Sequence, residues 1–305
     1  MTKTIRLLLP FLLLWGGAGA EPVARLHSLL LDAVIVADGV IVAVGERGLV
    51  VRSEDSGLTW IPQVSNTNAT LTAVAFAADG RRGWAVGHEA LVLATTDGGR
   101  TWYQAYQGPN IEESFLDLAV VAPGEIIVIG AYGQYLESRD DGATWRPGAA
   151  AEDDSHLNRL TIGPTGTLYI AGERGTLLRS DDLGRTWQNI ASPYDGSFFG
   201  VLPLSETELL AHGLRGRIYR SADNGESWTQ VPNDKPALLA TACRLPAGEI
   251  VLAGQSRAFF VSRDGGHTFT TWPLPNTHAV AQLLIAPDGR LLAFGEEGAS
   301  ALAQP

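Results

Sequence analysis

Four arginines stand out because they recur at one place in a repeated sequence unit, two or three residues after a glycine that returns every 41 to 43 residues. They are Arg47, Arg174, Arg215 and Arg257. Tyr132 occupies the same place in another copy of the unit. A guanidinium group binds a carboxylate through two parallel hydrogen bonds, so arginines brought together would bind acidic groups of a ligand or partner. The alternative is that they pair with neighbours such as Glu46 and Glu173 and only solvate the surface.

Other residue types that carry chemistry are sparse. The six histidines include no pair at metal-ligand spacing, the single Cys243 excludes a cysteine-rich metal site, and no Gly-x-Ser-x-Gly motif marks a nucleophile. With 33 acidic and 22 basic side chains, the chain is not built to neutralise nucleic-acid phosphates. We therefore expect no metal, no cofactor, no catalytic set and no nucleic-acid partner.

A second motif, S-x-D-x-G-x-T-W, repeats with the same period, and we call each copy a box. The box aspartates are Asp55, Asp97, Asp140, Asp182, Asp223 and Asp264, at spacings of 42, 43, 42, 41 and 41 residues. An aspartate before a turn accepts backbone N–H groups, the glycine supplies a positive φ, and the tryptophan packs between repeats. We expect the boxes to be structural rather than calcium-binding or catalytic.

The repeat predicts an all-β fold. The periodic glycines are Gly45, Gly87, Gly130, Gly172, Gly213, Gly254 and Gly295, which gives seven units of about 42 residues. Short apolar runs before each glycine and around the turns predict four strands per unit. Four-stranded sheets of this period bury both faces when they stack radially, so we predict a seven-bladed β-propeller with the first strand of each blade at the channel and the fourth at the rim.

The last unit ends about where its fourth strand would begin. We expect the segment from Pro22 to His27 to supply that strand and close the ring by joining the N- and C-terminal segments. The alternative is a three-stranded last blade. The turns after the periodic glycines and the boxes should lie on opposite faces, which places the four arginines together on one face.

Residues 1–20 have the pattern of a signal peptide. Lys3 and Arg6 precede an apolar run from Leu7 to Trp15, and Ala18 and Ala20 match a cleavage site before Glu21. We expect residues 21–305 to form one exported domain, periplasmic or secreted, without a membrane span and monomeric.

The stretches Leu71–Phe76, Gly83–Gly87 and Asp97–Trp102 resemble the repeat of the photosystem II stability/assembly factor family. That resemblance covers essentially the whole chain after the signal segment. It implies an exported seven-bladed propeller that helps to assemble a membrane-protein complex, in the thylakoid lumen if the source is photosynthetic. In the family, arginines on one face are implicated in client binding, and the four arginines named above look like their counterpart. Glu89 and Glu297 interrupt the basic series here.

Two other functions compete with this interpretation. A sialidase-like glycoside hydrolase would need an arginine triad and a tyrosine nucleophile, for which Tyr132 is the candidate, but the Phe-Arg-Ile-Pro signature and long catalytic insertions are missing. A passive subunit of an envelope transport or secretion complex would look much the same in sequence. Our hypothesis is a non-catalytic exported scaffold that binds a membrane-protein complex or another envelope protein.

Overall fold

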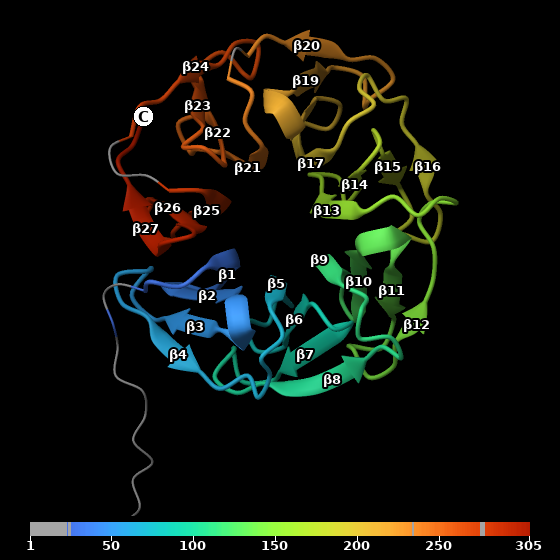
Figure 1. Cartoon of the computed structure of the whole chain (residues 1–305), viewed down its shortest axis with the longest axis vertical. Helices are drawn as coiled ribbons and strands as arrows, with labels where there is room; N and C mark the ends of the chain where they lie inside the picture. The colour runs from blue at the N-terminus through green and yellow to red at the C-terminus, as the bar shows by residue number, and fades with distance from the viewer. Residues whose placement is uncertain (1–22, 24–25, 234, 275–277) are drawn as a thin grey trace, which may run out of the picture.

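Runs of apolar and β-branched residues alternate with glycine-containing turns along the chain, which favours antiparallel hairpins over helices. The computed structural model describes residues 23, 26–233, 235–274 and 278–305, and in them these runs form 27 strands in seven sheets. The sheets stand around a central channel as the blades of a propeller (Figure 1). The predicted all-β, seven-bladed fold is confirmed.

Each blade is numbered in chain order, and its first two strands lie nearest the channel. The first strands are β1 (Leu30–Ala37), β5 (Leu71–Phe76), β9 (Phe115–Ala122), β13 (Leu157–Ile162), β17 (Phe198–Pro203), β21 (Leu239–Arg244) and β25 (Val280–Ile285). The second strands are β2 (Val40–Gly45), β6 (Gly83–Gly87), β10 (Glu125–Gly130), β14 (Leu168–Gly172), β18 (Leu209–Gly213), β22 (Ile250–Gly254) and β26 (Leu291–Gly295).

The outer half of each blade is shorter and more exposed. The third strands are β3 (Val50–Ser53), β7 (Leu91–Thr95), β11 (Tyr135–Ser138), β15 (Leu177–Ser180), β19 (Ile218–Ser221), β23 (Phe259–Ser262) and β27 (Gly298–Leu302). The fourth, rim strands are β4 (Ile61–Gln63), β8 (Tyr103–Gln107), β12 (Arg146–Pro147), β16 (Gln188–Asn189), β20 (Thr229–Val231) and β24 (Thr270–Thr271). Blades 1 to 6 are four-stranded, whereas blade 7 has three strands among the described residues.

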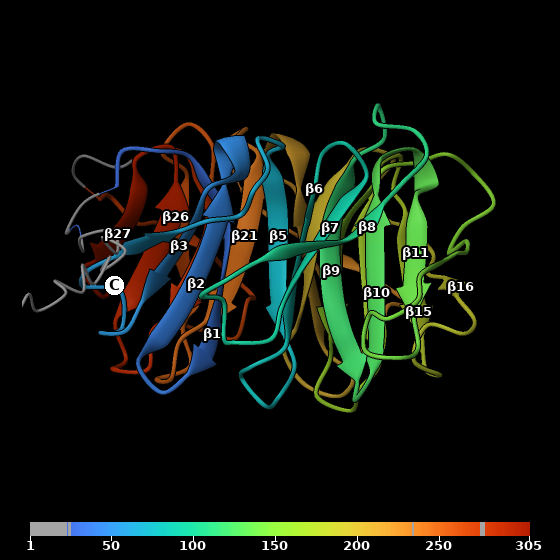
Figure 2. The ribbon, with the colours of Figure 1, turned by 90° about the horizontal axis from the view of Figure 1, so that it is seen from below.

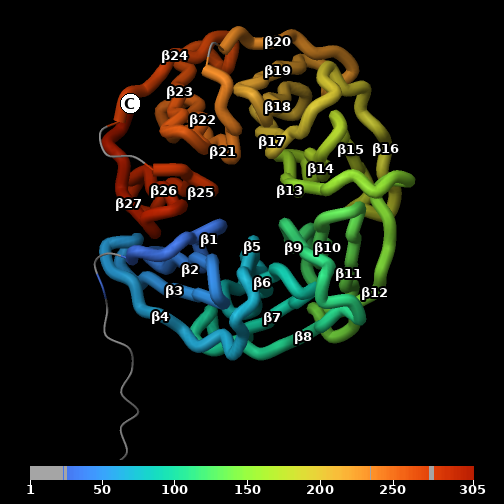
Figure 3. Tube along the Cα trace, in the orientation of Figure 1, coloured from blue at the N-terminus to red at the C-terminus, as the bar shows by residue number. Residues whose placement is uncertain are grey.

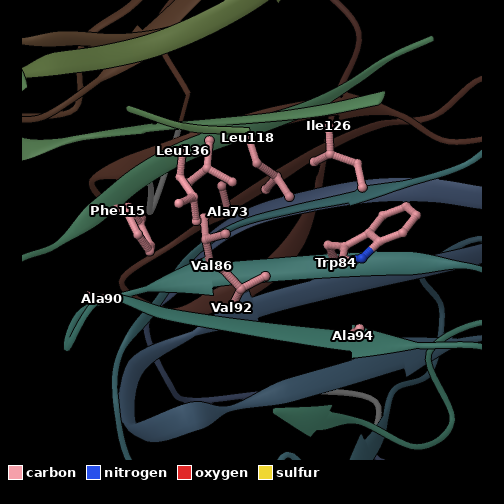
Figure 4. Packing of buried hydrophobic residues seen from close by; sticks show 11 residues of the cluster. Ala73, Trp84, Val86, Ala90, Val92, Ala94, Phe115, Leu118, Ile126 and Leu136 are labelled. Carbon is pink, nitrogen blue, oxygen red and sulfur yellow. The ribbon is translucent and has the colours of Figure 1, made fainter. Parts of the chain in front are cut away.

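The hydrophobic core is divided into seven clusters, one at each boundary between neighbouring blades. Between blades 2 and 3, for example, Trp84 and Val92 of one blade pack against Leu118 and Ile126 of the next (Figure 4). Between blades 7 and 1, Trp60 meets Phe294 edge-on at 5.8 Å. Because every cluster needs two blades, no blade can bury its apolar faces alone, and stability depends on the closed ring.

The two faces of the ring carry different turns. The second and third strands of three blades are joined by single 3-10 turns, η1 (Glu46–Gly48), η2 (Ala131–Gly133) and η3 (Leu214–Gly216), which share one face in Figures 1 and 2. We call it the turn face. The boxes join the third and fourth strands on the opposite, box face. Among the described residues, no helix has the length and apolar character needed to cross a membrane.

In the box turns the aspartate side chain accepts hydrogen bonds from the turn that follows it. In blade 4 the Asp182 carboxylate accepts hydrogen bonds from the Thr186 backbone N–H (2.9 Å), the Thr186 hydroxyl (2.6 Å) and the Ser180 hydroxyl (2.8 Å). Gly184 has a φ of 79°, and the corresponding glycine of every other box also has a positive φ of similar size. These bonds lower the pKa of Asp182 to about 2. The six box aspartates all accept the same kind of bonds.

The ring closes where blades 7 and 1 meet, but the described part of the N-terminal segment pairs with blade 1 and does not supply the predicted fourth strand of blade 7. Pro22, Ala24 and Arg25 lie outside the described residues. Val23 exchanges two backbone hydrogen bonds of 2.9 Å with Trp60 of blade 1, and Leu26 packs in the core between blades 7 and 1. The described residues add no fourth strand to blade 7, so the outer edge of β27 has no backbone partner among them.

The path of that segment matches the other blade-to-blade connections. The Leu26 carbonyl oxygen lies close to where a Cβ on Gly298 would be. The carbonyl oxygens of Thr67 and Lys235 lie in the same way beside Gly48 and Gly216. In each case the carbonyl comes four residues before the next first strand. The segment therefore takes the place of a connection from blade 7 to blade 1.

Candidate partner-binding site

The turns that carry the predicted arginines have an unusual backbone. Arg47, Tyr132, Arg174 and Arg215 have φ values of 53°, 54°, 51° and 58°, and Ser256 and Arg257 both have 55°. In most of these blades a glycine follows, also with positive φ, such as Gly48 at 69°. A two-residue hairpin in this left-handed conformation usually takes Asn-Gly, because the Cβ of any other residue meets the following carbonyl oxygen at a cost of about 1–2 kcal/mol, which Asn offsets by local hydrogen bonds. Strain of this kind, repeated at one place, is typical of functional turns.

The four arginines share the turn face but not the same surroundings. All four are exposed. Arg174 pairs with Asp154 at 2.5 Å, which lowers the pKa of Asp154. Arg47, Arg215 and Arg257 have no ion pair with any residue that the structure describes. Three guanidinium groups are therefore available to a partner, and the fourth is already engaged.

The acidic neighbours do not neutralise the arginines as the alternative supposed. Glu46 accepts the Leu29 backbone N–H at 3.0 Å, and Glu173 accepts that of His156 at 3.4 Å. Glu296, at the same place in blade 7, accepts that of Ala279 at 3.3 Å. These glutamates hold the connection that leads into their own blade. The acid that pairs with Arg174 comes instead from the connection between blades 3 and 4.

Blades 5 and 6 hold the densest group of basic side chains on the turn face, which we call the basic pole: Arg215, Arg217, Lys235 and Arg257. The Lys235 ammonium donates to the Arg257 carbonyl oxygen at 3.1 Å, and the turn at Gly216 is hydrogen-bonded to the connection that carries Lys235. Arg217 lies over the Tyr194 ring at 5.8 Å, and its buried Nε has no partner among the described residues. Arg257 also lines a depression of about 480 Å³ that reaches Glu296.

Tyr132 is set apart from the arginines. Its side chain is 66% exposed and meets the His156 ring edge-on, with centroids 4.6 Å apart. The His156 Nδ1 lies 3.6 Å from Glu173. No described carboxylate is hydrogen-bonded to the Tyr132 hydroxyl. Of the arginines in that blade, Arg139 pairs with Glu125 and Glu137, and Arg146 lies in the rim strand β12. Among the described residues, the geometry of a sialidase nucleophile is thus not assembled around Tyr132.

A polar belt in the central channel was missed in the sequence analysis. In every blade a β-bulge follows the start of the first strand. The third residues of blades 4 to 7 line one pocket of the channel, and Arg159 reaches Asp32 and Asp117 from there, whereas Ala73 packs in the core between blades 2 and 3. The seven third residues are Asp32, Ala73, Asp117, Arg159, Gly200, Thr241 and Gln282. Polar residues at one register in otherwise apolar strands are the signal that would have revealed the belt.

The belt and its neighbours connect the blades. Each of the seven boundaries has at least one side-chain hydrogen bond from a first or second strand among the described residues. The pairs are Asp32 with Val74 N–H, Thr72 with Phe115 C=O, Asp117 with Leu160 N–H, Asn158 with Phe198 C=O, His212 with Leu239 C=O, Thr241 with Leu283 N–H and Gln282 with Asp32.

Arg159 is the only cation of the belt. Its guanidinium lies 3.9 Å from Asp32 and 3.8 Å from Asp117 and has no hydrogen bond to a described residue. Burial raises the pKa of Asp32 to about 6 and also raises that of Asp117, although Arg159 opposes both shifts. A pocket of about 220 Å³ lies beside Arg159 in the channel, next to Gly200, which has no side chain to fill it. Burial lowers the pKa of His212 in its wall to about 4, so that ring is neutral at pH 7.

Neither the turn face nor the channel offers a metal site among the described residues: no group of three or more histidine, cysteine or carboxylate side chains converges there. Cys243 is a free thiol whose pKa is raised to about 12 by burial. The arrangement is one of exposed cations on one face above a polar channel, which suits binding.

Comparisons with known proteins agree with this geometry. A family model described as photosynthesis system II assembly factor YCF48 matches residues 24–109 and 105–299. The solved structure entitled "YCF48 bound to D1 peptide" aligns with a TM-score of 0.76 at 22% identity, over 93% of this chain and 97% of that one. YCF48 from Cyanidioschyzon merolae aligns with a TM-score of 0.74 at 18% identity, over 92% and 97%.

Propellers of other functions share the same fold. An ancestral GH74 enzyme aligns with a TM-score of 0.73 at 13% identity, over 92% of this chain and 45% of that one. No curated protein sequence matches the chain significantly. At these identities the structural neighbours show the fold alone, and the assignment to a family rests on the family model.

Proposed function

This chain belongs to the family of photosynthesis system II assembly factor YCF48, and from that premise we propose that it is a non-catalytic, exported scaffold. Its turn face binds a polypeptide segment of a membrane-protein complex, or of another envelope protein, while that complex is assembled. The signal segment over residues 1–20 directs the chain out of the cytoplasm, to the periplasm or, in a photosynthetic source, to the thylakoid lumen. There it acts as a monomer.

One observation carries this proposal. Arg47, Arg215 and Arg257 stay exposed, lack an ion pair among the described residues and occupy a left-handed backbone that disfavours residues with a Cβ. On the box face, by contrast, Arg100 pairs with Glu54 of the neighbouring blade at 3.0 Å. Arginines kept free at a conformational cost are suited to an acidic partner.

A polypeptide partner is supported by the family. The homologue of known structure is described as bound to a D1 peptide, so this propeller type accepts a peptide. Guanidinium forks would engage aspartate, glutamate or terminal carboxylates of the segment. Because these contacts lie at the surface, salt should weaken them strongly.

Charge reversal tests the assigned face. Arg215→Glu with Arg257→Glu should abolish co-purification of the partner from detergent-solubilised membranes, because the carboxylates would then meet like charge. Arg81→Glu with Arg263→Glu is the matched control, since both are exposed, carry the same charge and lie on the box-face side. Both proteins should keep the wild-type circular dichroism spectrum. Retention of the partner by the turn-face variant would contradict the proposal.

The enzymatic alternative has a direct assay. We expect no turnover of a fluorogenic sialoside by the purified chain, because no tyrosine–carboxylate pair or arginine triad is assembled among the described residues. Steady hydrolysis that Tyr132→Phe abolishes would replace the scaffold with a glycoside hydrolase.

A further inference from the structure

The turn face carries a second charged region, the acidic pole, which lies in blade 2 and the connections before and after blade 3. Its members are Glu89, Glu112, Glu113, Glu152, Asp153 and Asp154. The Ala90 N–H donates to the Glu113 carbonyl oxygen at 2.9 Å, and the Gly133 N–H to that of Ser155 at 3.0 Å, so both connections are fixed against the turns of their blades. Arg174 pairs with Asp154 alone, which leaves five of the six carboxylates without an ion pair among the described residues.

Two large apolar side chains are exposed within the acidic pole. Ile111, beside Glu112, and Tyr132 are each 66% exposed, the largest exposures of an isoleucine and a tyrosine on this face. Tyr132 is held in the left-handed conformation by the same turn that holds the arginines in other blades. Exposed apolar groups surrounded by free carboxylates suit a partner segment that is both basic and apolar.

The basic and acidic poles lie on opposite sides of the channel mouth. The basic pole belongs to β17–β20 and β21–β24, whereas the acidic pole belongs to β5–β8 and β9–β12 (Figure 3). In a ring of seven blades, blade 2 faces the boundary between blades 5 and 6. The electrostatic potential of the turn face therefore changes sign from one side of the channel mouth to the other.

We propose that the turn face binds one segment laid across the channel mouth, with an acidic end on the basic pole and a basic end, carrying an apolar side chain, on the acidic pole. This inference rests on the proposed function, since it assigns the chemistry of the partner that the same face binds. A uniformly acidic segment would gain at the basic pole but meet the like charge of the acidic pole. The surface thus fixes both the charge pattern and the direction of its partner.

Peptide probes test the pattern directly. Two 16-residue peptides of equal composition, each about 50 Å long when extended, carry four glutamates and four lysines plus a tryptophan, either segregated at opposite ends or alternating. Fluorescence anisotropy at low salt should give the full-length wild-type chain an affinity about tenfold higher for the segregated peptide. Equal affinities for the two peptides would overturn the inference.

Variants separate the two poles. Glu112→Lys with Glu113→Lys should lower the affinity for the segregated peptide about fivefold and raise the affinity for a uniformly acidic peptide. Glu112→Gln with Glu113→Gln should change both affinities in the same directions but less. If both acidic-pole variants bind the segregated peptide as the wild type does, while Arg215→Glu with Arg257→Glu abolishes binding, the two-pole surface is wrong and the proposed function stands. If no variant at either pole changes binding, both the two-pole surface and the proposed binding function of the turn face are wrong.

Discussion

At the scale of single residues, the most informative feature is the left-handed conformation of Arg47, Arg174 and Arg215. Sequence repetition placed them at one position, but it could not show their conformation, because the glycine that normally marks such a turn comes one residue later. The same limit applies to Glu46 and Glu173. Their recurrence was visible, yet their role as acceptors for the Leu29 and His156 N–H groups depends on how the chain enters the next blade.

Relief of this strain should separate stability from binding. Arg215→Gly removes a side chain that costs about 1–2 kcal/mol in the left-handed region, against a Gly entropy cost of about 0.5–1 kcal/mol, so we expect stabilisation by about 0.5–1 kcal/mol. Partner binding should fall at the same time. Urea unfolding monitored by tryptophan fluorescence measures the first effect, with Arg263→Gly as a control that gains nothing. A net loss of stability in Arg215→Gly would show that the turn is unstrained.

At the scale of elements, the repeat predicted the seven blades, since each is a local unit with its own turn glycines. The polar belt does not stand out in the repeat, because its members share a register of the first strands and not a position in the turns. Asp32, Asp117 and Arg159, for example, are each the third residue of a first strand. The sequence alone still could not show the β-bulge that follows the start of each of these strands.

The box turn can be tested at Asp182. Asp182→Ala leaves the Thr186 N–H and hydroxyl without their acceptor, which should cost about 1–3 kcal/mol of unfolding free energy at pH 7. The pKa of Asp182 is about 2 in the fold and near 3.8 otherwise, so its contribution is present above pH 4 and lost as the pH falls toward 2. Urea unfolding at pH 7 and pH 3 should therefore show a smaller penalty at pH 3. A penalty that is equal at both values would exclude the ionised carboxylate as the source.

At the scale of the whole molecule, the channel belt links the ring to pH. The folded pKa of Asp32, about 6, lies above the unfolded value near 3.8, so its contribution to stability is full below pH 4 and is lost as the pH rises to 6. One pKa unit corresponds to about 1.4 kcal/mol, which gives a loss of about 2–3 kcal/mol between pH 4 and pH 7 from this group. His212 acts in the opposite direction over the same range, because its folded pKa of about 4 lies below the ordinary value of 6.5 and its contribution to stability is lost as the pH falls through that interval. The box aspartates also act in that direction below pH 4, so the contribution of Asp32 has to be isolated by substitution.

Asp32→Asn isolates that effect. The amide keeps an oxygen for the Val74 N–H but cannot ionise, so the stability of the variant relative to the wild type should rise by about 2–3 kcal/mol between pH 4.5 and pH 7.5. Chemical denaturation at the two pH values measures it, and Thr241→Val serves as a belt variant that does not titrate. A wild-type pH slope retained in Asp32→Asn would assign the dependence to another group.

The outer edge of β27, which has no backbone partner among the described residues, has a consequence for how the protein is made. The strand reads Gly-Ala-Ser-Ala-Leu, with no proline or charge to discourage a neighbour, and peptide groups left open along a flat strand act as a template for another chain. Newly synthesised chains at high concentration, in which blades 7 and 1 have not yet joined, would pair with one another through the edge of β27. Correct folding therefore requires blades 7 and 1 of one molecule to join before two molecules pair at this edge. A low protein concentration and slow refolding favour that order.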